Sequence, residues 1–185
     1  MIQLFIGGVR SGKSAAAETL LIERVKSDCL KPAYIATSVA FGDETIERIE
    51  KHKQSRQSQF DLPIATHELD YQQVDLLSVL QSLNSPDNIV LIECLSTWVG
   101  WYLCLDNPLT QNLIILEQQQ ALLLSFLATA KCDVIIVTGE VGCGLIGETP
   151  LQRRYADKLG ELNQNVAALS EHVSLVTAGI KQTLK

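Results

Sequence analysis

The chain has 185 residues, a length that fits one domain spanning residues 1–185 around one hydrophobic core. Its formal net charge of −6 argues against a nucleic-acid partner, which would need a basic surface, and favours a small substrate. Five scattered cysteines without a C-x-x-C pair suggest neither a disulfide framework nor a zinc site, and no apolar run has bilayer length, so we expect a cytoplasmic protein with no membrane span.

Short β-rich runs alternate with longer helical patterns along the chain. The predicted strands are Ile2–Ile6, Ala33–Ala36, Ile64–His67, Ile89–Glu93, Val134–Thr138 and Val173–Thr177. Runs 89–92 and 134–137 are apolar throughout rather than alternating, which indicates burial on both faces of a sheet. The pattern predicts an α/β fold with a mostly parallel sheet, helices on both faces, and ligands at the carboxyl ends of the strands.

Residues 7–14 read GGVRSGKS and lie between the first predicted strand and a helical run. This order of strand, glycine-rich loop and helix is typical of a phosphate-binding loop. Gly7 and Gly12 permit backbone angles that turn several N–H groups inward. Lys13 supplies a charge for the β- and γ-phosphates, and the Ser14 hydroxyl can bind Mg²⁺. The sequence therefore predicts a P-loop protein that binds a nucleoside triphosphate.

A basic helix is predicted within residues 43–56, where Arg48, His52 and Arg56 recur every four residues and share one face. Two flanking arginines disfavour the imidazolium form, so His52 would be neutral and nucleophilic near neutral pH. The same arginines could grip a polyphosphate. From spacing alone, a solvated basic face is the commoner outcome, and both interpretations stay open.

Glu93 ends a buried predicted strand, which is the arrangement that lets an acid reach the Mg²⁺ held by a phosphate loop. An ordinary strand-end acid in solvent is the alternative.

Residues 138–148 contain four glycines directly after another buried strand, which favours a loop that covers a ligand over a plain long loop. Arg153 and Arg154 follow and either bind phosphate or form a solvated helix face. The helix should begin after Thr149, with Gln152 closing a capping box, and run to about Leu169. Aromatic residues of the helix after Glu93, at 98, 101 and 102, are expected to pack rather than bind a cofactor.

With these motifs in place, the chain resembles the bifunctional adenosylcobinamide kinase/adenosylcobinamide-phosphate guanylyltransferase family of cobalamin biosynthesis, over nearly its whole length. The resemblance rests on the order and spacing of eight segments: GGVRSGKS at 7–14, YIATS at 34–38, DETIERIEKHKQSR at 43–56, THE at 66–68, LIECLSTW at 91–98, GEVGCGLIGE at 139–148, LNQNVA at 162–167 and the ending AGIKQTLK.

The resemblance implies a P-loop NTPase-type, RecA-like fold and two reactions. In the first, ATP or GTP phosphorylates adenosylcobinamide. In the second, GMP passes from GTP to adenosylcobinamide phosphate and pyrophosphate is released. Members of the family assemble as homotrimers, which implies that each chain's histidine helix would lie near a neighbouring subunit.

The resemblance also implies roles for particular residues. The guanylyl group would rest on His52, which begins the segment matching the family's H-[KR]-x-x-R pattern. Lys13 would be the second catalytic residue, and Ser14 and Glu93 would hold the metal. The implied nucleotide contacts are Gly7, Gly8, Val9, Arg10, Ser11, Gly12, Lys13, Ser14, Ala36, Thr37, Ser38, Lys53, Gln54, Ser55, Arg56, Glu68 and Glu93.

The chain departs from the family pattern at four positions. Gly139 replaces the usual Asn, Gly147 the usual Pro, Ala156 a frequent Arg, and Phe60 the usual Trp. These changes bear on the corrinoid contacts and on the relative rates of the two steps, and they leave the phosphate loop and the histidine intact.

Two other functions remain compatible with the motifs considered singly. One is a P-loop kinase of another small hydroxyl substrate, with the basic helix as a lid and no covalent intermediate. The other is a nucleotide-dependent switch protein that acts through partners. The extensive match outside the phosphate loop argues against the switch protein, and the P-loop kinase stays as the alternative.

Overall fold

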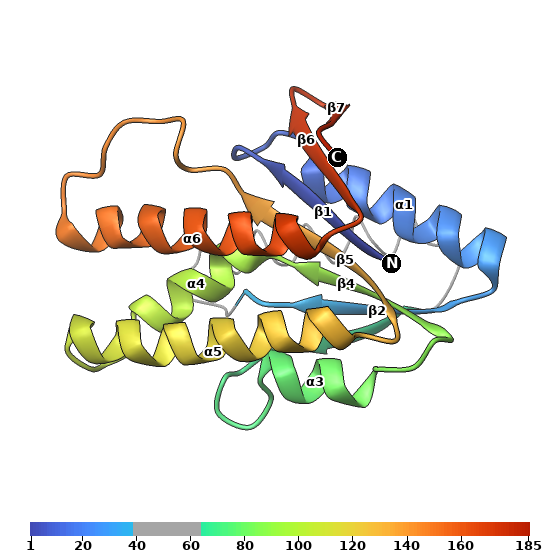
Figure 1. Ribbon diagram of the computed structural model, residues 1–185, viewed down its shortest axis with the longest axis horizontal. Helices are drawn as coiled ribbons and strands as arrows, with labels where there is room; N and C mark the ends of the chain where they lie inside the picture. The colour runs from blue at the N-terminus through green and yellow to red at the C-terminus, as the bar shows by residue number, and fades with distance from the viewer. Residues whose placement is uncertain (39–63) are drawn as a thin grey trace.

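The fold is a seven-stranded sheet with helices on both faces, seen in a computed structural model that describes residues 1–38 and 64–185 (Figure 1). Along the sheet the order is β3-β2-β4-β5-β1-β6-β7. The strands are β1 (Ile2–Gly7), β2 (Lys31–Ala36), β3 (Ala65–Glu68), β4 (Asn88–Glu93), β5 (Asp133–Gly139), β6 (His172–Thr177) and β7 (Ile180–Thr183). Every pair from β3 to β6 is parallel, and β7 runs antiparallel to β6. The six predicted strands and the mostly parallel sheet are confirmed, whereas β7 was not predicted.

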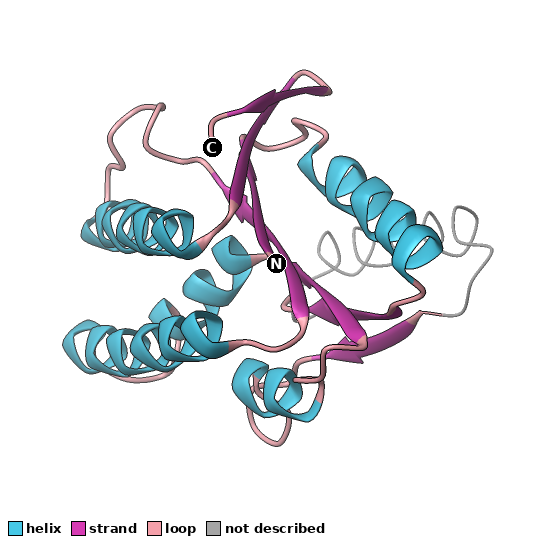
Figure 2. Ribbon diagram, turned by 45° about the vertical axis from the view of Figure 1, so that its right-hand side comes forward, coloured by secondary structure: helices cyan, strands magenta, loops and turns pink. Residues whose placement is uncertain are grey.

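The described helices divide between the two faces of the sheet (Figure 2). They are α1 (Lys13–Asp28), α3 (Leu76–Ser82), α4 (Leu95–Leu103), α5 (Leu109–Thr129) and α6 (Pro150–Leu169). Helix α1 covers one face, and the other four pack on the opposite face (Figure 2). The α/β architecture with two helical layers is therefore confirmed. None of these helices combines the length and apolar character that crossing a bilayer requires.

The central strands divide their side chains between two apolar clusters, one on each face. In β4, Val90 and Ile92 join the cluster under α4, α5 and α6, while Ile89 and Leu91 join the cluster under α1. Strand β5 divides its residues in the same alternating way. Because side chains alternate along a strand, burial of both faces requires the unbroken apolar runs noted in the sequence.

The start of α6 follows its sequence signal closely. The Thr149 Oγ1 accepts the Gln152 N–H at 3.2 Å, and the Gln152 Oε1 accepts the Thr149 N–H at 3.0 Å. Pro150 occupies the first turn, where its missing N–H costs nothing, and the helix ends at Leu169. The predicted capping box and both helix ends are confirmed.

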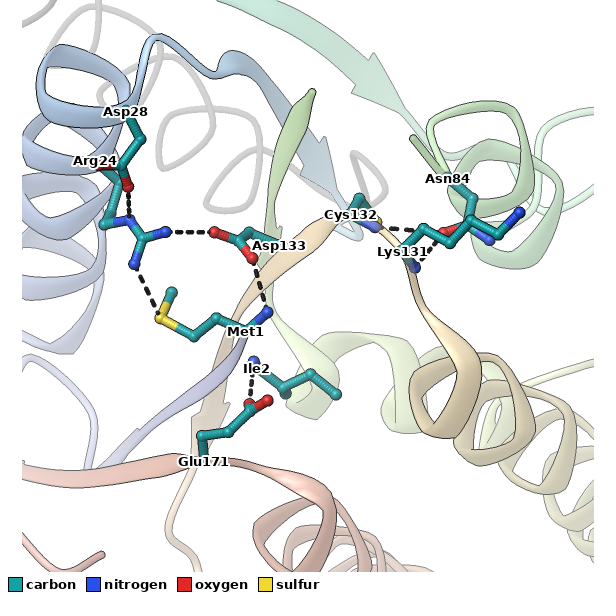
Figure 3. Close-up of polar contacts among 9 residues, drawn as sticks. All are labelled: Met1, Ile2, Arg24, Asp28, Asn84, Lys131, Cys132, Asp133 and Glu171. Carbon is teal, nitrogen blue, oxygen red and sulfur yellow. Dashed lines mark hydrogen bonds and ion pairs between the residues drawn. The ribbon is translucent and has the colours of Figure 1, made fainter. Parts of the chain in front are cut away.

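The amino edge of the sheet is held by polar contacts (Figure 3). The Arg24 Nη2 lies 2.7 Å from the Asp133 Oδ2, and its Nε lies 2.6 Å from the Asp28 Oδ2. The Met1 ammonium lies 2.7 Å from the other Asp133 oxygen, and the Ile2 N–H donates to Glu171. These contacts join the starts of β1 and β5 to α1 and to the residue before β6, at the edge opposite the predicted ligand edge.

Candidate functional site

The phosphate loop leaves β1 at the carboxyl edge of the sheet and enters α1 directly, as the sequence predicted. Gly12 caps α1 with a φ of +94°, a left-handed angle that glycine adopts without strain. Gly7 is constrained for a different reason than expected, since it has no left-handed φ. A Cβ there would lie 2.4 Å from the Val176 carbonyl oxygen, so Gly7 is required by the close approach of β6.

Lys13, which was predicted to supply a positive charge to the phosphates, has its side chain against the phosphate loop. Its Nζ donates to the Gly8 carbonyl at 3.1 Å, which places the ammonium against the main chain of the loop. The loop is closed by the Ser11 N–H, which donates to the same Gly8 carbonyl at 3.3 Å. On the β5 side, the Glu140 N–H donates to the Gly7 carbonyl at 3.0 Å. The loop is thus fixed to a neighbouring strand end as well as to itself.

Ser14 and Glu93, the two residues predicted to hold a metal, lie together. The Ser14 Oγ donates to the Glu93 Oε1 at 2.8 Å, although β4 and β1 are separated in the sheet by β5. Hydroxyl and carboxylate oxygens are ligands suited to Mg²⁺, which usually takes one or two protein groups and completes its shell with water and phosphate. Within residues 1–38 and 64–185 there is no cluster of three or more His, Cys, Asp or Glu side chains for a metal. The pair therefore fits a magnesium ion shared with a nucleotide rather than an all-protein metal cage.

The end of β2 lies beside Glu93 in the sheet. Ala36 is the register partner of Glu93 in β4 on one side and of Glu68 in β3 on the other. Three of the residues predicted to contact a nucleotide therefore end neighbouring strands at one level of the carboxyl edge.

Thr37 holds the main chain that follows Glu93. Its side chain is 1% exposed, and its Oγ1 both donates to the Cys94 carbonyl and accepts the Cys94 N–H, each at 2.7 Å. The Thr37 N–H donates to the Glu93 carbonyl at 2.8 Å. A further bond of 2.5 Å links its hydroxyl to that of Thr97, in the first turn of α4. The hydroxyl of Thr37 is therefore engaged in fixing the position of Glu93.

Tyr71 is a further residue of this region that the sequence did not single out. Its Oη donates to the Thr37 carbonyl at 2.6 Å, and burial raises the pKa of its phenol well above the ordinary value. The ring stacks on Trp101 with centroids 4.8 Å apart and meets the edge of Tyr102 at 5.8 Å. The predicted packing role of the α4 aromatic residues is confirmed, and through Tyr71 that packing supports the end of β2.

The second glycine-rich loop, residues 139–148, follows β5 at the same edge. Its start is fixed by Asn163, whose Nδ2 donates to the Gly139 carbonyl at 3.0 Å while its Oδ1 accepts the buried Thr138 hydroxyl at 2.7 Å. Farther along, Leu145 is 99% exposed and Ile146 is 85% exposed. The loop thus presents two apolar side chains to solvent.

The arginines that follow this loop differ in their surroundings. The Arg153 Nη1 donates to the carbonyls of Gly147 and Glu148 at 2.9 and 2.8 Å, so this guanidinium closes the loop. Arg154 is exposed, as a solvated helix face would have it. At Gly147, an added Cβ would come within 2.5 Å of the Gln152 Cβ, so the proline usual in the resembled family would need a different loop path.

The predicted histidine segment lies outside the described residues. This holds for Arg48 and His52 and for the implied nucleotide contacts Lys53, Gln54, Ser55 and Arg56, as well as for Phe60.

Known proteins match the chain over its full length. The family model described as "Cobinamide kinase / cobinamide phosphate guanyltransferase" matches residues 3–184. The bifunctional adenosylcobalamin biosynthesis protein CobU of Escherichia coli is 34% identical over 194 residues, and that of Salmonella typhimurium is 31% identical over 193, with all of each chain covered in both cases. The bifunctional adenosylcobalamin biosynthesis protein CobP of Pseudomonas aeruginosa is 32% identical over 188 residues, which cover 100% of this chain and 98% of that protein.

Proposed function

The chain belongs to the cobinamide kinase / cobinamide phosphate guanyltransferase family, and on this premise we propose how its residues carry out the two reactions. It is a bifunctional transferase of cobalamin biosynthesis. Adenosylcobinamide is phosphorylated by a nucleoside triphosphate, and GMP from GTP is then added to give adenosylcobinamide-GDP and pyrophosphate. The observation that carries the residue assignment is the Ser14–Glu93 hydrogen bond at the end of the phosphate loop.

In the kinase step, the phosphate loop binds ATP or GTP. Main-chain N–H groups of residues 7–14 and the Lys13 ammonium contact the β- and γ-phosphates, and positive groups placed there stabilise the charge that develops as the γ-phosphoryl group moves. The Lys13 Nζ lies 3.1 Å from the Gly8 carbonyl, which places it at the loop that would bind the phosphates.

Ser14 and Glu93 are the residues that would hold Mg²⁺. Their oxygens lie 2.8 Å apart, and Thr37 fixes the main chain on which Glu93 stands. When bound, the ion neutralises phosphate charge and orients the transferring group. The remaining implied nucleotide contacts at this edge are Ala36, Thr37, Ser38 and Glu68.

In the transferase step, we assign the nucleophile to His52. Its ring nitrogen attacks the α-phosphorus of GTP, an N–P bond forms, the bond from the α-phosphorus to the bridging oxygen breaks, and pyrophosphate leaves. An oxygen of adenosylcobinamide phosphate then attacks the same phosphorus and releases the imidazole. Lys53, Gln54, Ser55 and Arg56 would contact the nucleotide.

Several further properties belong to this proposal. Residues 1–185 form one domain, the protein acts in the cytoplasm, and three copies assemble as a homotrimer that brings each histidine segment near a neighbouring subunit. The cellular substrates are adenosylcobinamide, adenosylcobinamide phosphate, GTP and ATP.

Labelled GTP distinguishes this mechanism from that of a simple P-loop kinase. With α-labelled GTP and Mg²⁺, we expect label that remains on the denatured protein, is lost on addition of adenosylcobinamide phosphate, and is absent in His52→Ala. The matched control is His172→Ala, which changes an exposed histidine at the start of β6 and should keep the label. Label that washes away from the wild type, while γ-label still reaches the corrinoid, would leave a kinase without a covalent intermediate.

A further inference from the structure

The turn between β6 and β7 lies against the phosphate loop. The Gly179 N–H donates to the Ser11 carbonyl at 2.8 Å. A Cβ built on Gly12 would lie 3.2 Å from the Gly179 Cα, so the two main chains are in direct contact. The preceding strand makes a second contact, since the Val176 carbonyl closely approaches Gly7. The β6–β7 hairpin, drawn in red in Figure 1, therefore supports the loop on the side away from β5.

The hydrogen bond from Gly179 to the Ser11 carbonyl fixes the direction of the Gly12 N–H, which we expect to contact phosphate. The Ser11 carbonyl and the Gly12 N–H belong to one planar trans peptide and point in opposite directions. When Gly179 holds the carbonyl oxygen toward the hairpin, the Gly12 N–H must point away from the hairpin. Phosphate loops bind anions through such N–H groups, so the bond fixes the direction of one donor.

The same peptide would otherwise rotate with little hindrance. Gly12 has a φ of +94°, and glycine occupies positive and negative φ about equally well. A rotated Ser11–Gly12 peptide would turn a carbonyl oxygen toward the anionic ligand and remove an N–H from it. Gly12 gives the loop its shape but also lets the Ser11–Gly12 peptide rotate. A contact from outside the loop is therefore needed to prevent that rotation.

Strand β7 contributes little to the core, so packing of its side chains does not explain its presence next to the phosphate loop. All four of its residues are exposed, and among the described strands it pairs with β6 alone. The two residues between the register partners Thr177 and Ile180 have φ values of +51° at Ala178 and +79° at Gly179, the signs of a two-residue hairpin turn. The pairing of β7 with β6 therefore determines where the Gly179 N–H lies.

We propose that Gly179 is a positioning residue for the phosphate loop, which holds the Ser11–Gly12 peptide in the orientation that binds a triphosphate through its main-chain N–H. The inference rests on the proposed function only in taking the loop as the triphosphate site. It predicts that the hairpin tunes nucleotide affinity without touching the nucleotide.

The sharpest test removes this one donor. Replacement of Gly179 by glycolic acid, introduced by codon suppression, exchanges the N–H for an ester oxygen and leaves the side chain unchanged. We expect the Kd for a non-hydrolysable GTP analogue, measured by calorimetry with Mg²⁺, to rise about fivefold, the equivalent of roughly 1 kcal/mol for one hydrogen bond. The melting temperature should change little, and the Gly12 amide resonance should no longer shift on nucleotide binding as in the wild type.

A simpler pair of variants checks the same point. Gly179→Ala places a side chain at a φ of +79° where nothing lies within 4 Å, so it acts by straining the turn, and it should also weaken binding. Ala178→Gly changes the adjacent turn residue, keeps the Gly179 N–H, and should bind as the wild type does.

The results of these experiments distinguish failure of the proposed function from failure of the role assigned to Gly179. Wild-type protein that binds no triphosphate would contradict the proposed function, and this inference with it. Wild-type binding together with a Kd within twofold for the ester variant, or with an equal loss in Ala178→Gly, would contradict the role of Gly179 alone.

Discussion

Two glycine-rich loops leave adjacent parallel strands at the same edge of the sheet, yet their surroundings differ. The phosphate loop after β1 is held by main-chain bonds from Glu140 on one side and Gly179 on the other, and Ser14 binds Glu93. The loop after β5 is fixed at its start by Asn163 and at its end by Arg153, and between them Leu145 and Ile146 are exposed.

The glycines of the two loops meet different surroundings. In the first loop, the absence of a side chain at Gly7 and Gly12 lets β6 and the β6–β7 turn contact the main chain of the loop and hold it in place. In the second loop, an added Cβ at Gly147 would meet the Gln152 side chain of α6, and one at Gly144 would meet nothing within 4 Å. We therefore expect substitutions in the first loop to impair phosphate chemistry, and substitutions in the second to affect binding of the larger substrate.

The largest effect should come from Lys13→Ala in the phosphate loop. Loss of the ammonium removes a charge that stabilises the transferring phosphate, so kcat/KM for phosphorylation of adenosylcobinamide should fall about 10²- to 10³-fold. Steady-state kinetics with γ-labelled ATP measure it. Lys26→Ala, an exposed lysine on the same helix, is the control and should be near wild type. Equal activity in the two variants would remove Lys13 from the mechanism.

Glu93→Gln should have the next largest effect. The amide oxygen can still accept the Ser14 hydroxyl, while the negative charge that favours Mg²⁺ is lost. We expect kinase activity to fall about 10- to 100-fold and the Mg²⁺ concentration for half-maximal activity to rise. A magnesium titration of the rate measures this, with the exposed Glu23→Gln on α1 as control. An unchanged magnesium requirement would speak against the metal-binding role.

A double substitution in the second loop, Leu145→Ser with Ile146→Ser, should produce a smaller and more selective effect. Because both side chains are 85% exposed or more, the melting temperature should hardly change. If the loop covers the corrinoid, loss of apolar contact should raise KM for adenosylcobinamide roughly fivefold to tenfold, with KM for ATP unchanged. Leu122→Ser, at a 52% exposed position on α5, is the matched control. A KM for adenosylcobinamide equal to that of the control would make the loop a simple connection.

The smallest effect concerns stability at high pH. Tyr155 in α6 donates to the Ser96 carbonyl at 3.2 Å, and burial raises the pKa of its phenol from 10.0 to about 12. The unfolded phenol ionises first, so this stabilising contribution is present below pH 10 and is lost as the pH rises toward 12. Tyr155→Phe should therefore show a shallower fall of unfolding free energy between pH 10 and 12, after a loss of about 1 kcal/mol at pH 7. Urea unfolding across this range measures both, and parallel curves would show that Tyr155 is not the group that titrates.

The sequence predicted what depends on local pattern. Unbroken apolar runs revealed the doubly covered strands, and residues 7–14 carried their own signature for a loop between strand and helix. The juxtaposition of Ser14 and Glu93 also followed from sequence, because the carboxyl ends of parallel strands meet at one edge.

The contacts that the sequence did not reveal join residues distant along the chain. Tyr71 reaches Thr37 across 34 positions, and the Gly179 N–H reaches Ser11 from the far end of the chain. No short motif encodes such pairs, since each involves a main-chain group, the Thr37 carbonyl in one and the Gly179 N–H and Ser11 carbonyl in the other, and main-chain groups carry no residue identity. Strand β7 was missed because its exposed, partly polar residues lack the apolar pattern of the other strands.

The ion pairs among Arg24, Asp28 and Asp133 suggest that stability and catalysis can be engineered at different edges of the sheet. They lie at the amino edge (Figure 3). The phosphate loop and Glu93 follow or end their strands at the carboxyl edge. Thermostabilising substitutions could therefore be sought around Asp133 with little effect on catalysis, and variants changed only at the amino edge should stay active more often than variants changed only at the carboxyl edge.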